Sequence, residues 1–352
     1  MKILVTGGAG FIGTEVCRLL VSQPGIQVLN IDCLSYAANL DGIKDLSVNK
    51  RYTFETGDIR DGSRITALIE MFSPTAVIHL AAESHVDRSI DDSSEFISTN
   101  VLGTQVLLDC VLGYWKNLGS EEQKAFRFLH VSTDEVFGSL GEEGKFREDT
   151  PYKPNSPYAA SKAASNHLVR AWHQTYGLPV LITNCSNNFG PYQFPEKLIP
   201  LIIGNALEGR SLPVYGSGQN IRDWLYVEDH AQALLMVTQK GRMGESYNIG
   251  GGSERKNLDL VKEICNILDR LCPSSDVQSY SELISFVEDR PGHDFRYSVD
   301  DSKIRKELGW KPRWDFETGL EKTVLWYLDN RSWMEKVKAK SYSHARRGLA
   351  SS

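Results

Sequence analysis

Residues 1–13 read MKILVTGGAGFIG, a short apolar run that passes into a glycine-rich turn. The apolar run at 2–6 is typical of a buried strand, and a helical pattern follows at 11–22. Glycines at 8, 10 and 13 fit G-x-G-x-x-G, and those at 7, 10 and 13 fit the wider G-x-x-G-x-x-G. Glycine permits positive φ and lets backbone N–H groups approach a pyrophosphate at the helix N-terminus. The stretch therefore predicts a dinucleotide site.

The rest of the first half repeats this alternation of strand and helix. Further strands are expected at 27–31, 52–56, 76–80, 126–132 and 179–184, and helices at 62–72, 94–115 and 157–177. Apolar strands that alternate with helices predict an α/β fold with a doubly wound, parallel, Rossmann-type sheet. In such a sheet the ligand lies outside the carboxyl ends of the strands.

The second half is richer in proline and glycine. Helical patterns are expected at 196–208, 228–239, 257–270, 301–307 and 316–329. We expect a dinucleotide-binding domain over 1–185, with a segment near 225–256 that returns to its sheet. A smaller mixed α/β substrate lobe is expected over 186–333, and a basic, poorly ordered tail over 334–352.

Composition limits the classes of function. The 352 residues include 39 Lys plus Arg and 45 Asp plus Glu, a net charge of −6 that disfavours broad nucleic-acid binding. We expect no membrane span and no signal peptide, because no apolar run is long enough. The six cysteines form no C-x-x-C pair, which predicts reduced thiols, no metal site and a cytoplasmic protein.

Acidic and small residues at the expected strand ends indicate which dinucleotide binds. Asp32 lies 19 residues beyond Gly13, where a carboxylate accepts both adenosine ribose hydroxyls and repels a 2′-phosphate, so NAD is favoured over NADP. Asp58 and Ile59 fit an adenine contact after the third strand. Small residues let the cofactor pass close to the fourth strand end, which reads Leu80-Ala81-Ala82. The alternatives are a strand-end cap for Asp32 and helix packing for the alanines.

A second group of residues can move protons. Tyr158 and Lys162 are spaced i, i+4 on one helix face, where the ammonium would lower the phenol pKa and make Tyr158 an acid/base near neutral pH. Thr133, Asp134 and Glu135 end the fifth strand, beside the nicotinamide. Adjacent carboxyls that share a pocket repel each other, which would give one acid and one base. A surface Tyr–Lys pair and a polar strand end are the alternatives.

Longer segments extend these motifs. They are LAAESHVDRS (80–89), STDEVFG (132–138), NNFGPY (187–192), FPEKL (194–198), RDWLYV (222–227) and DRPGHD (289–294). On these segments the chain, from Lys2 to about Trp333, resembles the extended short-chain dehydrogenase/reductase family and its NAD-dependent epimerase/dehydratase group. Phe137 and Phe189 stand where that group usually carries tyrosine, and each loses a hydroxyl that the reaction does not need.

The resemblance implies a redox-neutral lyase that dehydrates dTDP-glucose to the 4-keto-6-deoxy sugar nucleotide. Tyr158, aided by Thr133 and Lys162, would take the 4-hydroxyl proton during oxidation by NAD. Glu135 would remove the C5 proton and Asp134 would protonate the departing 6-hydroxyl. UDP- or CDP-glucose as the substrate, and a sugar-nucleotide epimerase or decarboxylase of the same fold, stay open as alternatives. A non-catalytic dinucleotide sensor is disfavoured because the reactive residues are all present.

The resemblance also implies binding residues. Those expected at the cofactor, besides Asp32, Asp58, Ile59, Leu80, Ala81, Ala82, Tyr158 and Lys162, are Gly7, Gly10, Phe11, Ile12, Gly13, Leu34, Ser35, Ser84, Thr99 and Asn188. Lys197, Arg222 and Arg290 are the cations expected at a diphosphate. The other residues expected at the substrate are Ser84, His85, Thr133, Asn187, Leu198, Pro213, Tyr215, Asn257 and His293. Helices 94–115 and 157–177 would pair two subunits in a homodimer.

Overall fold

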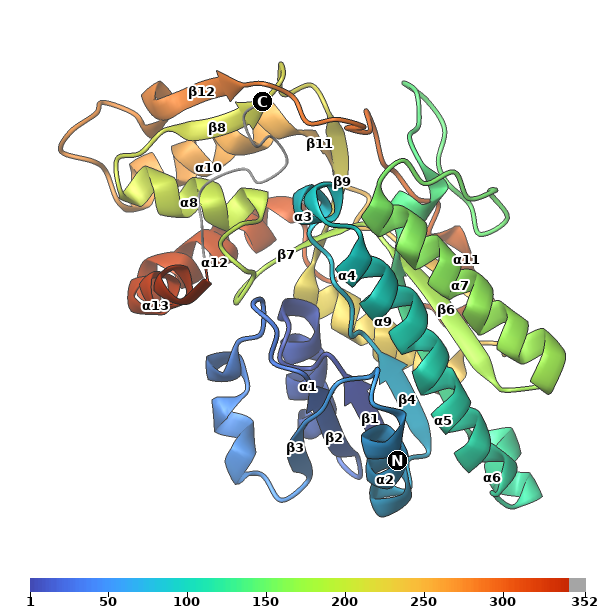
Figure 1. Cartoon of the computed structure of the whole chain (residues 1–352). Coiled ribbons are helices and arrows are strands. Elements are labelled where there is room, and N and C mark those ends of the chain that lie inside the picture. The colour runs from blue at the N-terminus through green and yellow to red at the C-terminus, as the bar shows by residue number, and fades with distance from the viewer. Residues whose placement is uncertain (342–352) are drawn as a thin grey trace.

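The computed structural model describes residues 1–341 and is built around one seven-stranded sheet (Figure 1). Its strand order is β10-β6-β5-β4-β1-β2-β3, and every neighbouring pair is parallel. The strands are β1 (Lys2–Thr6), β2 (Gln27–Asp32), β3 (Tyr52–Thr56), β4 (Ala76–His79), β5 (Arg127–Thr133), β6 (Val180–Cys185) and β10 (Ser246–Ile249). The expected α/β class with a doubly wound parallel sheet is confirmed.

The strand order reverses direction at β1. From β1 the chain winds outward to β2 and β3, then crosses back to β4, β5 and β6 on the other side. Ligands of open α/β sheets bind in the crevice outside such a switch point, at the carboxyl ends of the strands. Thr6 of β1 pairs with Ile31 of β2 on one side and with His79 of β4 on the other, so these strand ends meet there.

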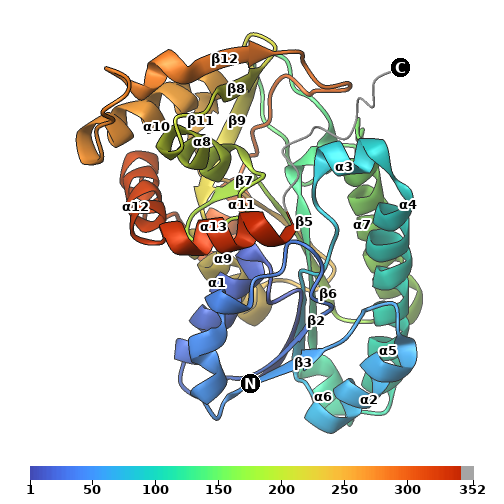
Figure 2. The same ribbon diagram turned by 60° about the vertical axis from the view of Figure 1, so that its left-hand side comes forward.

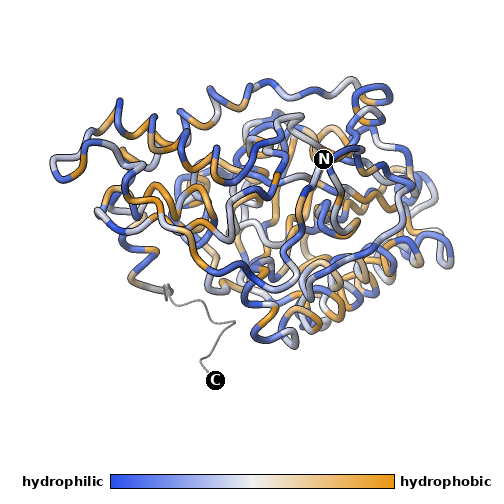
Figure 3. Tube along the Cα trace, turned by 90° about the horizontal axis from the view of Figure 1, so that it is seen from above, coloured by the Kyte–Doolittle hydropathy of each residue, from blue (hydrophilic) through white to orange (hydrophobic). Residues whose placement is uncertain are grey.

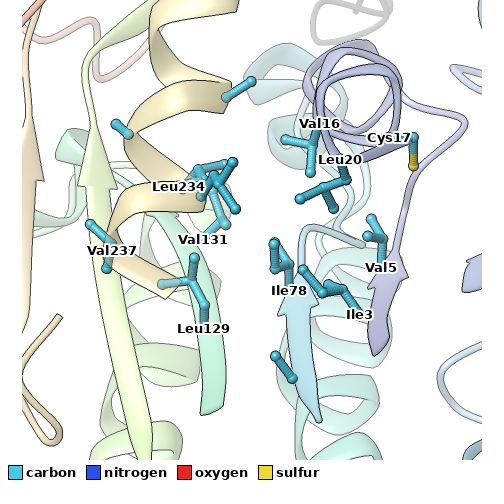
Figure 4. Packing of buried hydrophobic residues seen from close by; sticks show 14 of the residues in the cluster. Ile3, Val5, Val16, Cys17, Leu20, Ile78, Leu129, Val131, Leu234 and Val237 are labelled. Atoms are coloured by element: carbon cyan, nitrogen blue, oxygen red, sulfur yellow. The ribbon is translucent and has the colours of Figure 1, made fainter. Parts of the chain in front are cut away.

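Helices cover both faces of the sheet (Figures 1 and 2). On one face α1 (Phe11–Ser22) packs beside α9 (Val227–Lys240), and Leu20 and Leu234 meet the apolar side chains of β1, β4 and β5 (Figure 4). On the other face lie α2 (Gly62–Phe72), α5 (Thr104–Lys116) and α7 (Pro157–Tyr176). Strands buried on both faces explain why their sequences are almost continuously apolar.

A smaller lobe stands above the carboxyl ends of the strands. It contains a sheet of β11 (Glu254–Lys256), β9 (Ile221–Tyr226) and β7 (Asn187–Phe189), and a parallel pair of β8 (Leu212–Tyr215) and β12 (Ile284–Val287). Its helices are α8 (Leu198–Leu207), α10 (Asn257–Leu271) and α12 (Phe316–Asp329). They enclose a separate apolar core around Ile203, Ile264 and Tyr327. Figure 3 shows hydrophobic and hydrophilic positions alternating along helical segments of the chain.

Shorter elements complete the described chain. They are α3 (Val86–Asp91), α6 (Ser120–Ala125), α11 (Ser302–Leu308) and the 3-10 turns Leu40–Gly42, Lys44–Val48, Asp134–Phe137 and Tyr280–Leu283. After β6 the chain forms β7, α8, β8, β9 and α9 before it returns to the main sheet as β10. The two lobes are therefore interwoven along the sequence.

The helix expected at 94–115 is not one regular helix. It begins as α4 (Ser94–Phe96), continues as a π-helical segment, Ile97–Gly103, and becomes regular in α5. Asn100 lies in the wide turn and is buried. Its side-chain oxygen accepts from the Glu83 N–H, and its side-chain NH₂ donates to the Glu83 carbonyl oxygen and to the Ser161 hydroxyl. These bonds hold the wide turn in place. Hydropathy alone carries no signal for such a turn.

The same region bears on the membrane expectation. Among the described residues, Ser94–Lys116 is long and apolar enough to cross a membrane by length and composition alone, and 44% of its apolar window is buried inside the protein. Helices in the core of soluble proteins meet this criterion too, so the finding is weak evidence for a membrane span.

The tail predicted over 334–352 starts inside a helix, so its predicted start is too early. Residues 331–341 form a further helix, α13 (Arg331–Ser341), in which Trp333 and Met334 are buried. Trp333 packs against Tyr192 and Trp326 at ring distances of 5.7 and 5.1 Å, and these apolar contacts order the helix. The prediction was wrong here because it weighed the lysines and overlooked this aromatic anchor. Residues 342–352, with Arg346 and Arg347, lie outside the described part.

Candidate active site

A cavity of about 530 Å³ opens at the carboxyl ends of β1, β2, β4, β5 and β6. Its size falls in the range of small-molecule sites. The structure brings most of the expected residues to its wall: Gly7, Gly10, Phe11, Ile12, Gly13, Asp32, Ser35, Asp58, Ile59, Leu80, Ala81, Ala82, Ser84, Thr99, Thr133, Glu135, Tyr158, Lys162, Asn187, Asn188 and Lys197.

The glycine turn has the geometry that a pyrophosphate requires. Gly7 has φ of +75°, and a Cβ there would lie 2.7 Å from the Ala81 Cα. A Cβ on Gly13 would lie 2.1 Å from the Gly7 carbonyl oxygen, so glycine lets α1 start close against the turn. Gly10, the N-cap of α1, makes no side-chain cap, which leaves first-turn N–H groups available to an anion. The turn therefore fits a dinucleotide.

Asp32 is oriented by the backbone around it. Its Oδ2 accepts a hydrogen bond from the Ala9 N–H at 2.9 Å, and its Oδ1 accepts from the Leu34 N–H at 2.8 Å. Burial raises the pKa of this carboxyl, and those two bonds oppose the rise. Leu34 itself does not line the cavity; it adopts a left-handed φ of +55° and is 38% exposed. Only its backbone serves the site.

Asp58 differs from its expected role. Its carboxylate is held by Arg60, with Nη2 at 2.6 Å from Oδ2 and Nε at 3.0 Å from Oδ1, and this guanidinium lowers the pKa of Asp58. Arg60 also lines the cavity and pairs with Glu95. An adenine at this end would therefore meet an arginine–carboxylate pair and not a free carboxylate.

Tyr158 and Lys162 lie on the buried face of α7 and both line the cavity. The Lys162 Nζ donates to the Val131 carbonyl oxygen at 2.9 Å. Burial, with Glu135 nearby, raises the pKa of Tyr158 well above its ordinary value, and burial lowers the pKa of Lys162 to about 8. The i, i+4 spacing predicted a lowered tyrosine pKa, whereas burial, the largest cause, raises it in this structure.

The two adjacent carboxyls face different surroundings. Asp134 is 2% exposed and does not line the cavity; its Oδ1 accepts from the Thr133 hydroxyl at 3.3 Å, and its Oδ2 has no hydrogen-bond partner. Burial, then Glu135, raises its pKa well above the usual value. Glu135 lines the cavity, and burial raises its pKa while Arg290 and Lys197 oppose the rise. Burial thus favours the protonated form of both carboxyls, and nearby cations oppose this at Glu135.

Several residues expected at the substrate lie off the cavity wall, in the lobe and in the segment after β4. These are His85, Leu198, Pro213, Tyr215, Arg222, Asn257, Arg290 and His293. Arg290 reaches Asp87 at 3.3 Å, and the Tyr215 hydroxyl donates to the other oxygen of Asp87 at 3.2 Å. Arg222 is 4% exposed and donates to the Asp294 carbonyl oxygen at 2.9 Å. Since Arg222 and Arg290 both lower the Glu135 pKa, these cations lie near the reactive end.

The remaining off-wall residues occupy element ends or make protein contacts. Leu198 and Asn257 begin α8 and α10, and Pro213 lies in β8. His85 stands 3.5 Å from Glu196, and His293 lies 2.6 Å from Asp289. The structure therefore does not bring these side chains to the cavity.

Sequence reasoning missed several lining residues. Glu83, Gln193 and Glu196 line the cavity, although the motifs gave them no role. Glu196 was available as part of the FPEKL segment, next to Lys197. Asn188, expected at the cofactor, also has an unforeseen partner, because its Oδ1 lies 2.9 Å from the His230 Nδ1. No local pattern predicts that long-range contact.

Comparisons with known proteins agree with this geometry. The sequence profile of the family described as GDP-mannose 4,6 dehydratase matches residues 4–323, and the chain belongs to this family of sugar-nucleotide dehydratases. The expected resemblance to the dehydrogenase/reductase superfamily and its dehydratase group is thereby confirmed.

Individual relatives carry a narrower description. The chain is 56% identical over 351 residues to a dTDP-glucose 4,6-dehydratase of Salmonella typhimurium, with 97% of each chain covered. It also matches the solved dTDP-glucose 4,6-dehydratase of Streptomyces venezuelae, DesIV, at 45% identity and a TM-score of 0.87, covering 96% of this chain and 100% of that one. For the Bacillus anthracis enzyme the identity is 42% and the TM-score 0.85, with the same coverage. Both structures are described with NAD bound.

Proposed function

We propose that this protein is an NAD-dependent dTDP-glucose 4,6-dehydratase, a hydro-lyase that forms dTDP-4-keto-6-deoxy-D-glucose. One observation carries the proposal: of two adjacent carboxyls that follow β5, Glu135 lines the dinucleotide cavity with Tyr158 and Lys162, and Asp134 is buried next to it, within hydrogen-bond reach of the Thr133 hydroxyl. An epimerase needs no such acid–base pair for loss of water. The shared description of the relatives supports the same reaction.

The cofactor half of the cavity would hold NAD. Gly10 and the start of α1 would receive its pyrophosphate, and Asp32 would accept the adenosine ribose hydroxyls. Bound there, NAD would supply reversible hydride transfer, first from sugar C4 and then to C6. Tyr158, Thr133 and Lys162 line the wall where the sugar C4 would lie.

The chain's own residues would move the protons. Tyr158 takes the 4-hydroxyl proton, with Thr133 bonding the same oxygen. Burial opposes a phenolate at Tyr158, and the Lys162 ammonium, on the same face of α7, would offset that cost during the proton transfer. The resulting ketone acidifies C5, and Glu135 removes that proton. Asp134, which holds its proton tightly, gives it to the departing 6-hydroxyl, and water leaves. A proton returned to C5 completes the cycle with no net oxidation.

Cations near the reactive end would hold the nucleoside diphosphate. Lys197 lines the cavity, and its Nζ lies 3.0 Å from the Ser84 carbonyl oxygen. Arg222 and Arg290 lie close enough to Glu135 for their charges to lower its pKa. A diphosphate would draw these side chains away from their present partners.

The test is a product assay with one matched pair of variants. The protein is incubated with dTDP-, UDP- or CDP-glucose, and the 4-keto product is followed by its absorbance in alkali. We expect turnover of dTDP-glucose without added reductant. Glu135→Gln should abolish solvent-proton exchange at C5, whereas Asp134→Asn should retain exchange but lose water slowly. Exchange at the wild-type rate in Glu135→Gln would refute the role given to Glu135.

We also propose that two copies pair through α5, α7 and the π-helical segment, and that the protein acts in the cytoplasm. Ile97 and Leu102 of the π-helical segment are 49% and 51% exposed, and a partner helix would cover them. The six cysteines are free thiols, which suits a reducing compartment.

A further inference from the structure

Tyr36 lies in the loop after β2, at the edge of the cavity. Its neighbours Ser35, Ala37 and Ala38 line one side of the cavity, and Phe194 and Glu196 line it from the lobe. The Tyr36 hydroxyl donates to the Glu196 Oε1 at 3.0 Å, so one side chain joins the two sides.

The Tyr36 ring is held on both its face and its edge. The Arg88 guanidinium carbon stands 3.5 Å from the ring centroid, within the range of a close cation–π contact. The Phe194 ring meets it at 5.5 Å and 88°, an edge-to-face arrangement. Tyr36 is thus fixed by residues from two other segments of the chain.

Glu196 anchors this contact from the lobe. Its side chain is 6% exposed, and its Oε2 faces the Arg88 Nη2 at 3.4 Å and the His85 Nε2 at 3.5 Å. Its Oε1 accepts the hydrogen bond from the Tyr36 hydroxyl. A hydrogen bond to a buried carboxylate is among the stronger noncovalent contacts in proteins.

We propose that Tyr36, Arg88 and Glu196 form a clasp that closes the loop after β2 over the bound dinucleotide and slows its release. Tyr36 is a positioning residue in this clasp. The inference rests on the proposed function, because a cycle that borrows and returns electrons within one turnover requires a cofactor that stays bound. No motif in the sequence pointed to Tyr36.

The experiment measures cofactor release directly. Wild type and variants are loaded with radiolabelled NAD⁺ and chased with excess unlabelled NAD⁺, and the bound label is followed over time. Tyr36→Phe removes only the hydroxyl and should release label about tenfold faster, the effect of losing one hydrogen bond to a charged group. Glu196→Gln should also accelerate release. The fold-increase in release rate of the double variant should be smaller than the product of the two single fold-increases, because both substitutions remove the same contact.

Controls separate the clasp from general destabilisation. Glu208→Gln alters a surface carboxylate, paired with Lys338, and should leave release unchanged. The NAD⁺ association rate of Tyr36→Phe should stay within about twofold of wild type, because the clasp acts after binding. If Tyr36→Phe does not fold, Arg88→Lys replaces it, since lysine keeps the charge and loses the planar stack.

The experiment distinguishes failure of the clasp from failure of the proposed function. Wild-type protein that binds no NAD⁺, or that does not convert dTDP-glucose, would overturn the proposed function. Wild type that retains NAD⁺ while Tyr36→Phe releases it at the wild-type rate would overturn the clasp alone.

Discussion

At the scale of single residues, proton affinity in the site is decided by depth. Asp134 and Glu135 are consecutive, yet only Glu135 lines the cavity. Arg290, Lys197 and Arg222 oppose the rise in the Glu135 pKa, whereas of these cations only Arg222 opposes it at Asp134. The sequence predicted that one of the pair would have a raised pKa. It could not predict that burial would also raise the Tyr158 pKa, because the depth of α7 below the surface is a property of packing.

The raised pKa of Asp134 makes a prediction about stability. The folded protein binds this proton more tightly than the unfolded chain, so Asp134 costs increasing stability as pH rises above its unfolded pKa. Asp134→Asn should therefore gain stability over wild type between about pH 4.5 and pH 8, by about 1.4 kcal/mol for each unit of pKa shift crossed. Urea unfolding at both pH values measures this difference.

The matched control is Asp149→Asn, which changes a side chain that is 83% exposed. Its stability relative to wild type should be the same at both pH values. An equal result for Asp134→Asn would mean that Asp134 is ionised in the folded protein at neutral pH.

At the scale of elements, segments with a regular apolar pattern were predictable from the sequence, and segments that are ordered by packing against distant residues were not. The first six strands of the main sheet lie within one residue of their predicted bounds, because short apolar runs mark them. The strand β10 was predicted only as a returning segment near 225–256. The helix at 316–329 matches α12 at both ends. The bounds of the short strands β7, β8, β9, β11 and β12 were not predicted, since strands of three to six residues in a proline- and glycine-rich stretch lack a clear alternation. The helix α13 is anchored by Trp333, which packs on the neighbouring helix α12 and on Tyr192, far earlier in the chain.

Trp333 should therefore carry the stability of α13. It is 6% exposed and packs on Tyr192, Trp326 and Tyr327. Trp333→Ala should lower the free energy of unfolding by about 3–5 kcal/mol, because truncation leaves a large cavity. Chemical denaturation measures the loss. Lys336→Ala, an exposed position of the same helix, should change it little, and a similar loss in both variants would argue against the aromatic anchor.

At the scale of the whole molecule, an exposed apolar surface on Ser94–Lys116 indicates where a second copy of the chain would bind. The segment that meets the membrane criterion is also the segment of the proposed subunit contact, and a dimer would explain its exposed apolar face. The resemblance supplied this expectation; hydropathy alone could not distinguish a lipid from a second copy.

Leu102→Asp should therefore convert a dimer to a monomer. A carboxylate at a buried contact would be left without a partner, which strongly opposes association. Light scattering should report twice the monomer mass for wild type and the monomer mass for the variant. Val48→Asp alters a side chain that is 87% exposed in a 3-10 turn of another region, and it should stay dimeric. A dimeric Leu102→Asp would place the contact elsewhere.

The return of the chain as β10 has a consequence for dissection of the enzyme. A fragment that stops at the end of β6 would keep the glycine turn and the reactive tyrosine, yet it would present a bare sheet edge where Thr183 and Asn184 now pair with Tyr247 and Asn248. Unpaired edges recruit other strands and aggregate. The first 185 residues are therefore not a portable module, and a fragment meant to keep the cofactor site must also carry β10.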